Sequence, residues 1–209
     1  MNLKEKGREL FIVFLASAVL ALSVSFNKNN LLIYSFISFV IIIGINILIK
    51  KFVGYKFETK VKIKFWSWYR YGFRKDAHFK KPIPMLWLPL ILSLFSRGMF
   101  WWLTVLEFDV ESLPERASRR HGLYRFTEVT EYHIGWIAAL GIVANIVFAI
   151  IAYIIGEEYF AKLSIYYAAW SFLPLSTLDG GKILFASRGL WLVMLIIVLG
   201  FVGWGLIIV

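Results

Sequence analysis

The chain contains no cysteine, which excludes disulfide bonds and thiolate metal sites. Its three histidines are His78, His121 and His133, and none has a second histidine four residues further on. The HExxH motif of zinc peptidases is therefore absent. Charged residues are also scarce, at 17% of the 209 residues, whereas 60% are hydrophobic. This composition is too apolar for a soluble domain and predicts an integral membrane protein.

Five apolar runs have the length and composition of membrane-spanning helices. They cover residues 10–26, 31–49, 134–156, 162–187 and 189–209, and the fourth run is discontinuous. Residues 83–106 form a sixth hydrophobic element. Because Lys4, Lys6 and Arg8 precede the first run, the positive-inside rule predicts a cytoplasmic N-terminus, in the cell membrane. We expect residues 1–209 to form a single all-α polytopic membrane domain built from these six elements.

The element at residues 83–106 has two interpretations. Three prolines crowd its start, and Arg97-Gly98 interrupts its middle, where an arginine in lipid would be costly. The segment is either a full span or a re-entrant hairpin that turns near Ser96 to Gly98. Re-entrance places 21 of the 23 Lys and Arg residues on the inner side or dipping from it, so we expect re-entrance.

Two stretches alternate apolar and charged residues with the period of a half-buried β-strand. The first runs from Tyr55 to Phe65 and carries mostly lysine on its polar face. The second runs from Leu106 to Val110, and its polar face is acidic. Opposite charges stabilise neighbouring strands. We therefore expect these stretches to form a small β-sheet on the cytoplasmic side.

Residues 50–81 form a strongly basic loop. They contain eleven Lys or Arg residues against Glu58 and Asp76, which is most of the net charge of +10 of the whole chain. Because this charge lies next to membrane spans, it predicts contact with anionic lipid headgroups and not with nucleic acid.

The stretch from Ala168 to Ser187, AAWSFLPLSTLDGGKILFAS, breaks the fourth run. Pro174 prevents one continuous helix. Unwound backbone at membrane depth needs protein or a wet cavity to satisfy its polar groups, and an ionisable residue there, Asp179, suggests a functional site. The following Gly180 and Gly181 permit close approach of helices. The stretch predicts a polar pocket inside the membrane.

Three motifs resemble the site-2 protease family of intramembrane zinc metalloproteases. FLPLSTLDGG, at Phe172–Gly181, resembles the family's NxxPxxxLDG segment, and ALGIVANIVFA, at Ala139–Ala149, is similar to its GPxAN helix with Ile142 in place of proline. NILIKKFVG, at Asn46–Gly54, is placed like HELAHKFVA in short archaeal members. The resemblance implies the six-element site-2 protease core, with a pocket lined by Asn145, Pro174, Gly180 and Gly181.

The chain departs from this family at the catalytic residues themselves. Family members bind zinc through the two histidines of HExxH and the aspartate of LDG, and the glutamate activates water. Here the five HExxH positions read Asn46-Ile47-Leu48-Ile49-Lys50. Both histidine ligands and the general base are missing, and Asp179 cannot form a zinc site alone. We therefore expect no zinc and no catalytic residue, with Asn46, Ile47, Lys50 and Asp179 as degenerate active-site positions.

Three functions remain open at this stage. The first is an inactive site-2-protease-like protein, a pseudoprotease that binds a membrane protein or transmembrane peptide. The second is an active intramembrane metalloprotease with a non-standard metal site. The third is a structural or lipid-interacting subunit of a membrane complex.

The side chain of Lys50 has two possible places. It either pairs with Asp179 where the metal would be, with Asn46 one turn earlier bonding the free carboxylate oxygen, or it extends to the interface beside Lys51. Asn145 is expected either to form a helix–helix hydrogen bond or to line the pocket. His133 is expected to be interfacial.

Overall fold

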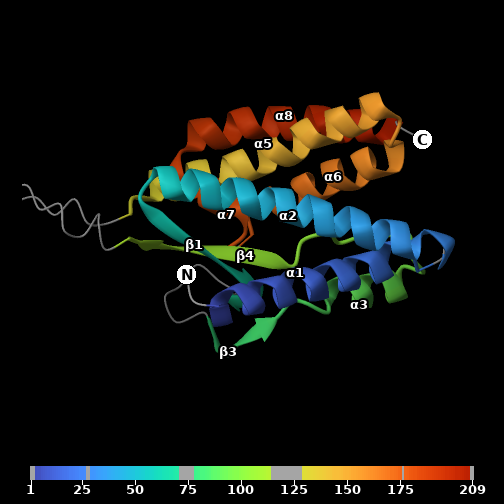
Figure 1. Ribbon diagram of the computed structural model, residues 1–209, viewed down its shortest axis with the longest axis horizontal. Helices are drawn as coiled ribbons and strands as arrows, with labels where there is room; N and C mark the ends of the chain where they lie inside the picture. The colour runs from blue at the N-terminus through green and yellow to red at the C-terminus, as the bar shows by residue number, and fades with distance from the viewer. Residues whose placement is uncertain (1–2, 27–28, 71–77, 114–128, 176, 208–209) are drawn as a thin grey trace, which may run out of the picture.

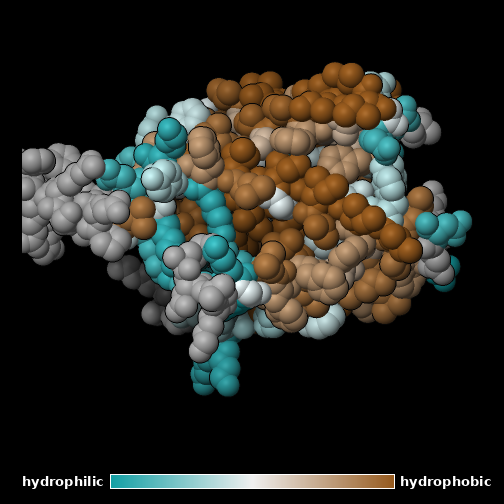
Figure 2. Space-filling view, in the orientation of Figure 1, coloured by the Kyte–Doolittle hydropathy of each residue, from teal (hydrophilic) through white to brown (hydrophobic). Residues whose placement is uncertain are grey.

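The computed structural model describes residues 3–26, 29–70, 78–113, 129–175 and 177–207. Helices make up most of it, and they run roughly side by side along the long axis, with two small β-sheets toward one end (Figure 1). The hydrophobic surface covers the helices, and the hydrophilic residues gather toward the two ends of the long axis (Figure 2). This distribution is that of a membrane protein.

Among the residues that the structure describes, four helices are long and apolar enough to cross a membrane. They are α1 (Leu3–Val24), α2 (Leu32–Lys56), α5 (Glu131–Ile155) and α8 (Arg188–Ile207). A short 3₁₀ turn, η1 (Asn29–Leu31), precedes α2. The fourth predicted run is divided into α6 (Glu158–Ser171) and α7 (Asp179–Ala186), so the break falls where Pro174 indicated it.

The segment at residues 83–106 is a hairpin whose two ends meet at Trp66. The backbone N–H of Met85 donates to the carbonyl of Trp66 (3.0 Å), and the N–H of Trp66 donates to the carbonyl of Val105 (2.8 Å). Helix α3 (Leu88–Phe95) forms the outgoing arm, and the return lacks regular structure. The chain therefore leaves and returns at the same end of the molecule, as a re-entrant segment requires.

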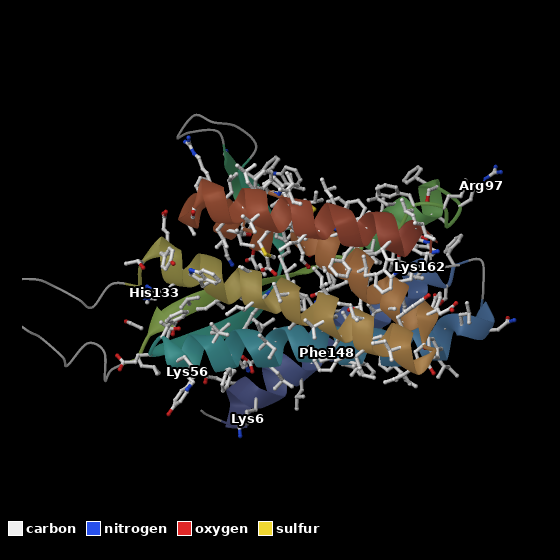
Figure 3. The ribbon with its side chains drawn as sticks, turned by 90° about the horizontal axis from the view of Figure 1, so that it is seen from above. Lys6, Lys56, Arg97, His133, Phe148 and Lys162 are labelled. Atoms are coloured by element: carbon white, nitrogen blue, oxygen red, sulfur yellow. The ribbon has the colours of Figure 1, made fainter. Side chains whose placement is uncertain are left out.

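Arg97 lies at the tip of this hairpin. Its φ of 53° and the φ of 77° at Gly98 reverse the chain direction there, and glycine adopts such a conformation without steric cost. Arg97 lies toward the same end of the molecule as Lys162 and opposite to Lys6 and Lys56 (Figure 3). The arginine is thus placed toward the far end of the helices and not at their midpoint, which removes the objection to a charge in mid-bilayer.

The strands form two antiparallel pairs. Strand β1 (Thr59–Phe65) pairs with β4 (Leu106–Ser112), and β2 (Ser67–Arg70) pairs with β3 (His78–Pro84). The predicted strand from Tyr55 was wrong in its first four residues. Helix α2 continues through Lys56, and a left-handed residue, Glu58 (φ 53°), ends the helical stretch before the strand begins.

The charged faces of β1 and β4 are complementary, as the alternation indicated. The ammonium group of Lys62 lies 2.6 Å from the carboxylate of Glu111, and Lys64 donates to Asp109. The hydrogen bond from Lys64 to Asp109 raises the pKa of Lys64. Both pairs are exposed, so each contributes at most about 1 kcal/mol. The hairpin of β2 and β3 was not predicted, because its residues had been assigned to the basic loop.

Candidate functional site

A buried ion pair joins α2 to α7. The Nζ atom of Lys50 lies 2.6 Å from Oδ2 of Asp179, and the two residues are 6% and 4% exposed. Lys50 lies near the C-terminal end of α2, and Asp179 is the first residue of α7, 129 residues later. Lys50 therefore pairs with Asp179 and does not extend to the interface beside Lys51.

The position of Asp179 depends on the close packing of Gly180 against the end of α6. A Cβ atom at Gly180 would lie 1.6 Å from the carbonyl oxygen of Phe172. Only glycine allows this approach, so the helix contact predicted for it is confirmed. Its neighbour Gly181 is also buried, whereas Pro174, in the break itself, is exposed.

A second glycine, Gly141 on α5, makes room for the lysine. A Cβ atom at Gly141 would lie 2.7 Å from Cε of Lys50 and 3.2 Å from Nδ2 of Asn46. The α5 backbone thus packs directly against the lysine stem. Sequence reasoning missed this role of Gly141, although Gly141 lies one helical turn before Asn145 and hence on the same face of α5.

A second lysine, Lys182, enters the site from α7. Its ammonium group lies 3.7 Å from the ring centroid of Phe108 and donates to the carbonyl of the same residue. The ammonium group of Lys50 lies 4.8 Å from the same centroid. Two ammonium groups therefore contact one aromatic ring, whose quadrupole attracts each of them, while the two positive charges repel each other. Sequence reasoning missed Lys182, although it lies three residues after Asp179 and hence on the same helix face.

Strand β4 also contacts the break in front of α7. The hydroxyl of Thr177 donates to the carboxylate of Glu107, the second residue of β4. Burial raises the pKa of Glu107, and the hydrogen bond from Thr177 opposes this shift. Strand β4 contacts the helix break and α7 through the carboxylate of Glu107 and the carbonyl of Phe108.

Two buried asparagines lie beside the ion pair on α2 and α5. Asn46 is 2% exposed and Asn145 is 0% exposed. Within the part of the chain that the structure describes, Nδ2 of Asn46 and both side-chain polar atoms of Asn145 have no hydrogen-bond partner. The predicted bond from the Asn46 amide to Asp179 was therefore wrong, because this amide is turned toward Gly141. The backbone carbonyl of Asn145 accepts a hydrogen bond from the hydroxyl of Ser164 (2.8 Å).

The residues at this site do not fit a zinc ion. Lys50 and Asn46 stand where the resemblance would place the histidine ligands, and Ile47, where it would place the general base, belongs to the hydrophobic core. The ammonium group of Lys50 already contacts the carboxylate that would serve as the third ligand. Across the described ranges, no three His, Cys, Asp or Glu residues lie close enough together to hold a metal.

His133 lies apart from the ion pair, in the first turn of α5. Its Nδ1 atom shares a hydrogen bond with the hydroxyl of Thr130, and its ring contacts Phe57 edge-on at 4.9 Å. It lies at the end of the molecule that carries Lys56 (Figure 3). The side chains of His78 and His121 lie outside the described residues.

Comparisons of the chain with protein families, curated proteins and solved structures find no match. The function is therefore argued from the residues themselves.

Proposed function

We propose that this chain is a catalytically inactive, site-2-protease-like membrane protein that binds a membrane protein or transmembrane peptide. The ion pair between Lys50 and Asp179 carries the proposal. A lysine stands where the resemblance places the second histidine ligand, and it neutralises the aspartate that the resemblance makes the third ligand. An ion pair at this place joins α2 to α7 without a metal.

The topology of the proposal follows the distribution of positive charge. The N-terminus, both small sheets and the basic loop at residues 50–81 face the cytoplasm, where the loop contacts anionic lipid headgroups. The hairpin at residues 83–106 enters the membrane from this side. The loop between α5 and α6 then faces the opposite side.

The partner segment binds in extended form along β4. Helices α1 and α2 pack against β1, and the β1–β4 pair has only two strands, so the outer edge of β4 is the more accessible one. Edge strands bind extended peptides through backbone hydrogen bonds. The contacts from Lys182 and Thr177 to β4 place this edge beside the helix break.

Metal analysis tests the absence of catalysis. The purified full chain is expected to contain far less than one zinc per molecule and to leave a transmembrane substrate uncleaved, because it has no general base. The measurement is elemental analysis together with a cleavage assay in proteoliposomes. About one zinc per chain, lost in Asp179→Ala, would show instead an active intramembrane metalloprotease with a non-standard metal site.

Cross-linking in native membranes tests partner binding. A photo-reactive residue in place of Asp109, on β4, is expected to cross-link to a transmembrane protein. The same residue in place of Val193, on the exposed face of α8, serves as the matched control and is expected to label only lipid. Identical lipid-only labelling at both positions would favour a structural or lipid-interacting subunit.

A further inference from the structure

A hydrophobic groove lies between α6, α8 and the returning arm of the hairpin. Its volume is about 680 Å³, and it is lined by apolar side chains from all three segments. Phe172 and Val198 form its floor and are 3% and 4% exposed, whereas Met99 and Leu206, at its mouth, are 88% and 68% exposed. Neither Lys50 nor Asp179 lines it, so it is separate from the ion-pair site.

Aromatic contacts join two walls of this groove, the returning arm of the hairpin and α6. Phe100 contacts Trp170 edge-on at 5.4 Å, and Trp101 contacts Tyr166 at 6.3 Å. Trp102 also packs on Trp170, with ring centroids 4.5 Å apart. These aromatic contacts hold the returning arm of the hairpin against α6.

The length of the groove matches one leaflet of a bilayer. On α8 its lining runs from Leu195 to Leu206, which at 1.5 Å per residue is about 16 Å. The hydrocarbon core is about 30 Å thick, so one leaflet contributes about 15 Å. Among the described lining residues Lys162 alone is charged, and it lies toward one end of the molecule, near the tip at Arg97 (Figure 3). The groove thus runs from a cation at one interface toward the middle of the bilayer.

The length of the groove favours a hydrocarbon chain over a transmembrane helix. The lining of the groove on α8 covers about 16 Å, whereas a helix that crosses the membrane needs about 30 Å. An unbranched acyl chain reaches from one interface to the middle of the bilayer, which is the length of the groove.

We infer that this groove binds one acyl chain of an anionic phospholipid from the leaflet on the Lys162 side. The chain lies along Val198 and Val202, and the headgroup contacts the ammonium group of Lys162. A single cation near the surface attracts an anionic lipid about fivefold over a neutral one. This inference does not rest on the proposed function, because the groove shares no residue with the ion pair.

Native mass spectrometry of the detergent-purified full chain tests the inference, with phosphatidylglycerol and phosphatidylcholine of identical acyl chains as probes. The chain is expected to retain one phosphatidylglycerol, with about fivefold preference over phosphatidylcholine. Val202→Phe, which fills the groove, is expected to lose the lipid. Val193→Phe makes the same change on the exposed face of α8, outside the groove, and is expected to retain it.

Two further variants separate the headgroup from the acyl chain. Lys162→Gln is expected to retain one lipid but to lose the preference for phosphatidylglycerol, whereas Lys6→Gln, at the opposite end, is expected to keep that preference.

Leu206→Trp repeats the test of Val202→Phe, because it blocks the exposed mouth of the groove without changing the core. Equal lipid retention in Val202→Phe, Leu206→Trp and Val193→Phe would overturn the inference, as would a protein helix in the groove. Loss of lipid in Val202→Phe with an intact partner cross-link at Asp109 would leave the proposed function standing.

Discussion

Lys50→Met and Asp179→Leu are each expected to lower the free energy of unfolding by about 3–5 kcal/mol, because each leaves the other charge buried without a partner. The double variant, with two apolar side chains in the same space, is expected to be much closer to the wild type. Unfolding in detergent can be followed by intrinsic fluorescence, since the chain has nine tryptophans. The quantity to be measured is the coupling free energy, which is the effect of the double variant minus the sum of the two single effects.

The exposed pair of Lys64 and Asp109 provides the matched control. Their side chains are 47% and 50% exposed, so Lys64→Met, Asp109→Leu and the double variant should each change the free energy of unfolding by at most about 1 kcal/mol. Strict additivity of the Lys50 and Asp179 changes would mean that the buried pair contributes no coupling, and the proposed replacement of a metal by an ion pair would fail with it.

Gly180→Ala is expected to have the second large effect. The added methyl group would lie 1.6 Å from the carbonyl oxygen of Phe172, a backbone atom that cannot move without displacing the end of α6. Helix α7 would have to shift, and Asp179 would move away from Lys50. We expect a loss of about 3 kcal/mol in the free energy of unfolding, at the upper end for overpacking.

Gly200→Ala on α8 is the control for this change. It makes the same substitution in a helix, but nothing lies within 4 Å of the added Cβ atom. Because alanine is the better helix former, it is expected to be neutral or to stabilise the chain by up to about 1 kcal/mol. Equal unfolding midpoints for the two alanine variants would mean that α7 adjusts freely, and that Gly180 does not determine the position of Asp179.

The long helices could be predicted because membrane thickness sets their length. The predicted run at 134–156 overlaps α5 closely, and the run at 31–49 lies in the first part of α2, which continues to Lys56. The break at Pro174 was located from backbone chemistry. The start of β1 could not be predicted in the same way. The apolar and charged residues from Tyr55 to Glu58 fit a strand pattern, but the hydrogen bonding of α2 continues through them. Local alternation does not reveal where a preceding helix ends.

The candidate site was predictable only in part. Asp179 could be singled out because it is an ionisable residue in an apolar context, where it needs a partner. Lys50 was singled out only through the resemblance of residues 46–50 to the HExxH segment. Helical spacing places Gly141 on the face of Asn145 and Lys182 on the face of Asp179, but what these residues contact depends on how α2, α5 and α7 meet in space. The same packing turned the Asn46 amide toward Gly141 and away from Asp179.

The separation of 129 residues between Lys50 and Asp179 has a consequence for biosynthesis. At 5–20 residues per second, the ribosome completes the aspartate roughly 6–26 seconds after the lysine. During that interval α2 enters the membrane with an uncompensated ammonium group, which is held at the interface by its flexible stem. Only a nascent chain translated past α7 can withdraw that charge into the protein, so the packing of α2 against α7 closes only after α7 has been synthesised.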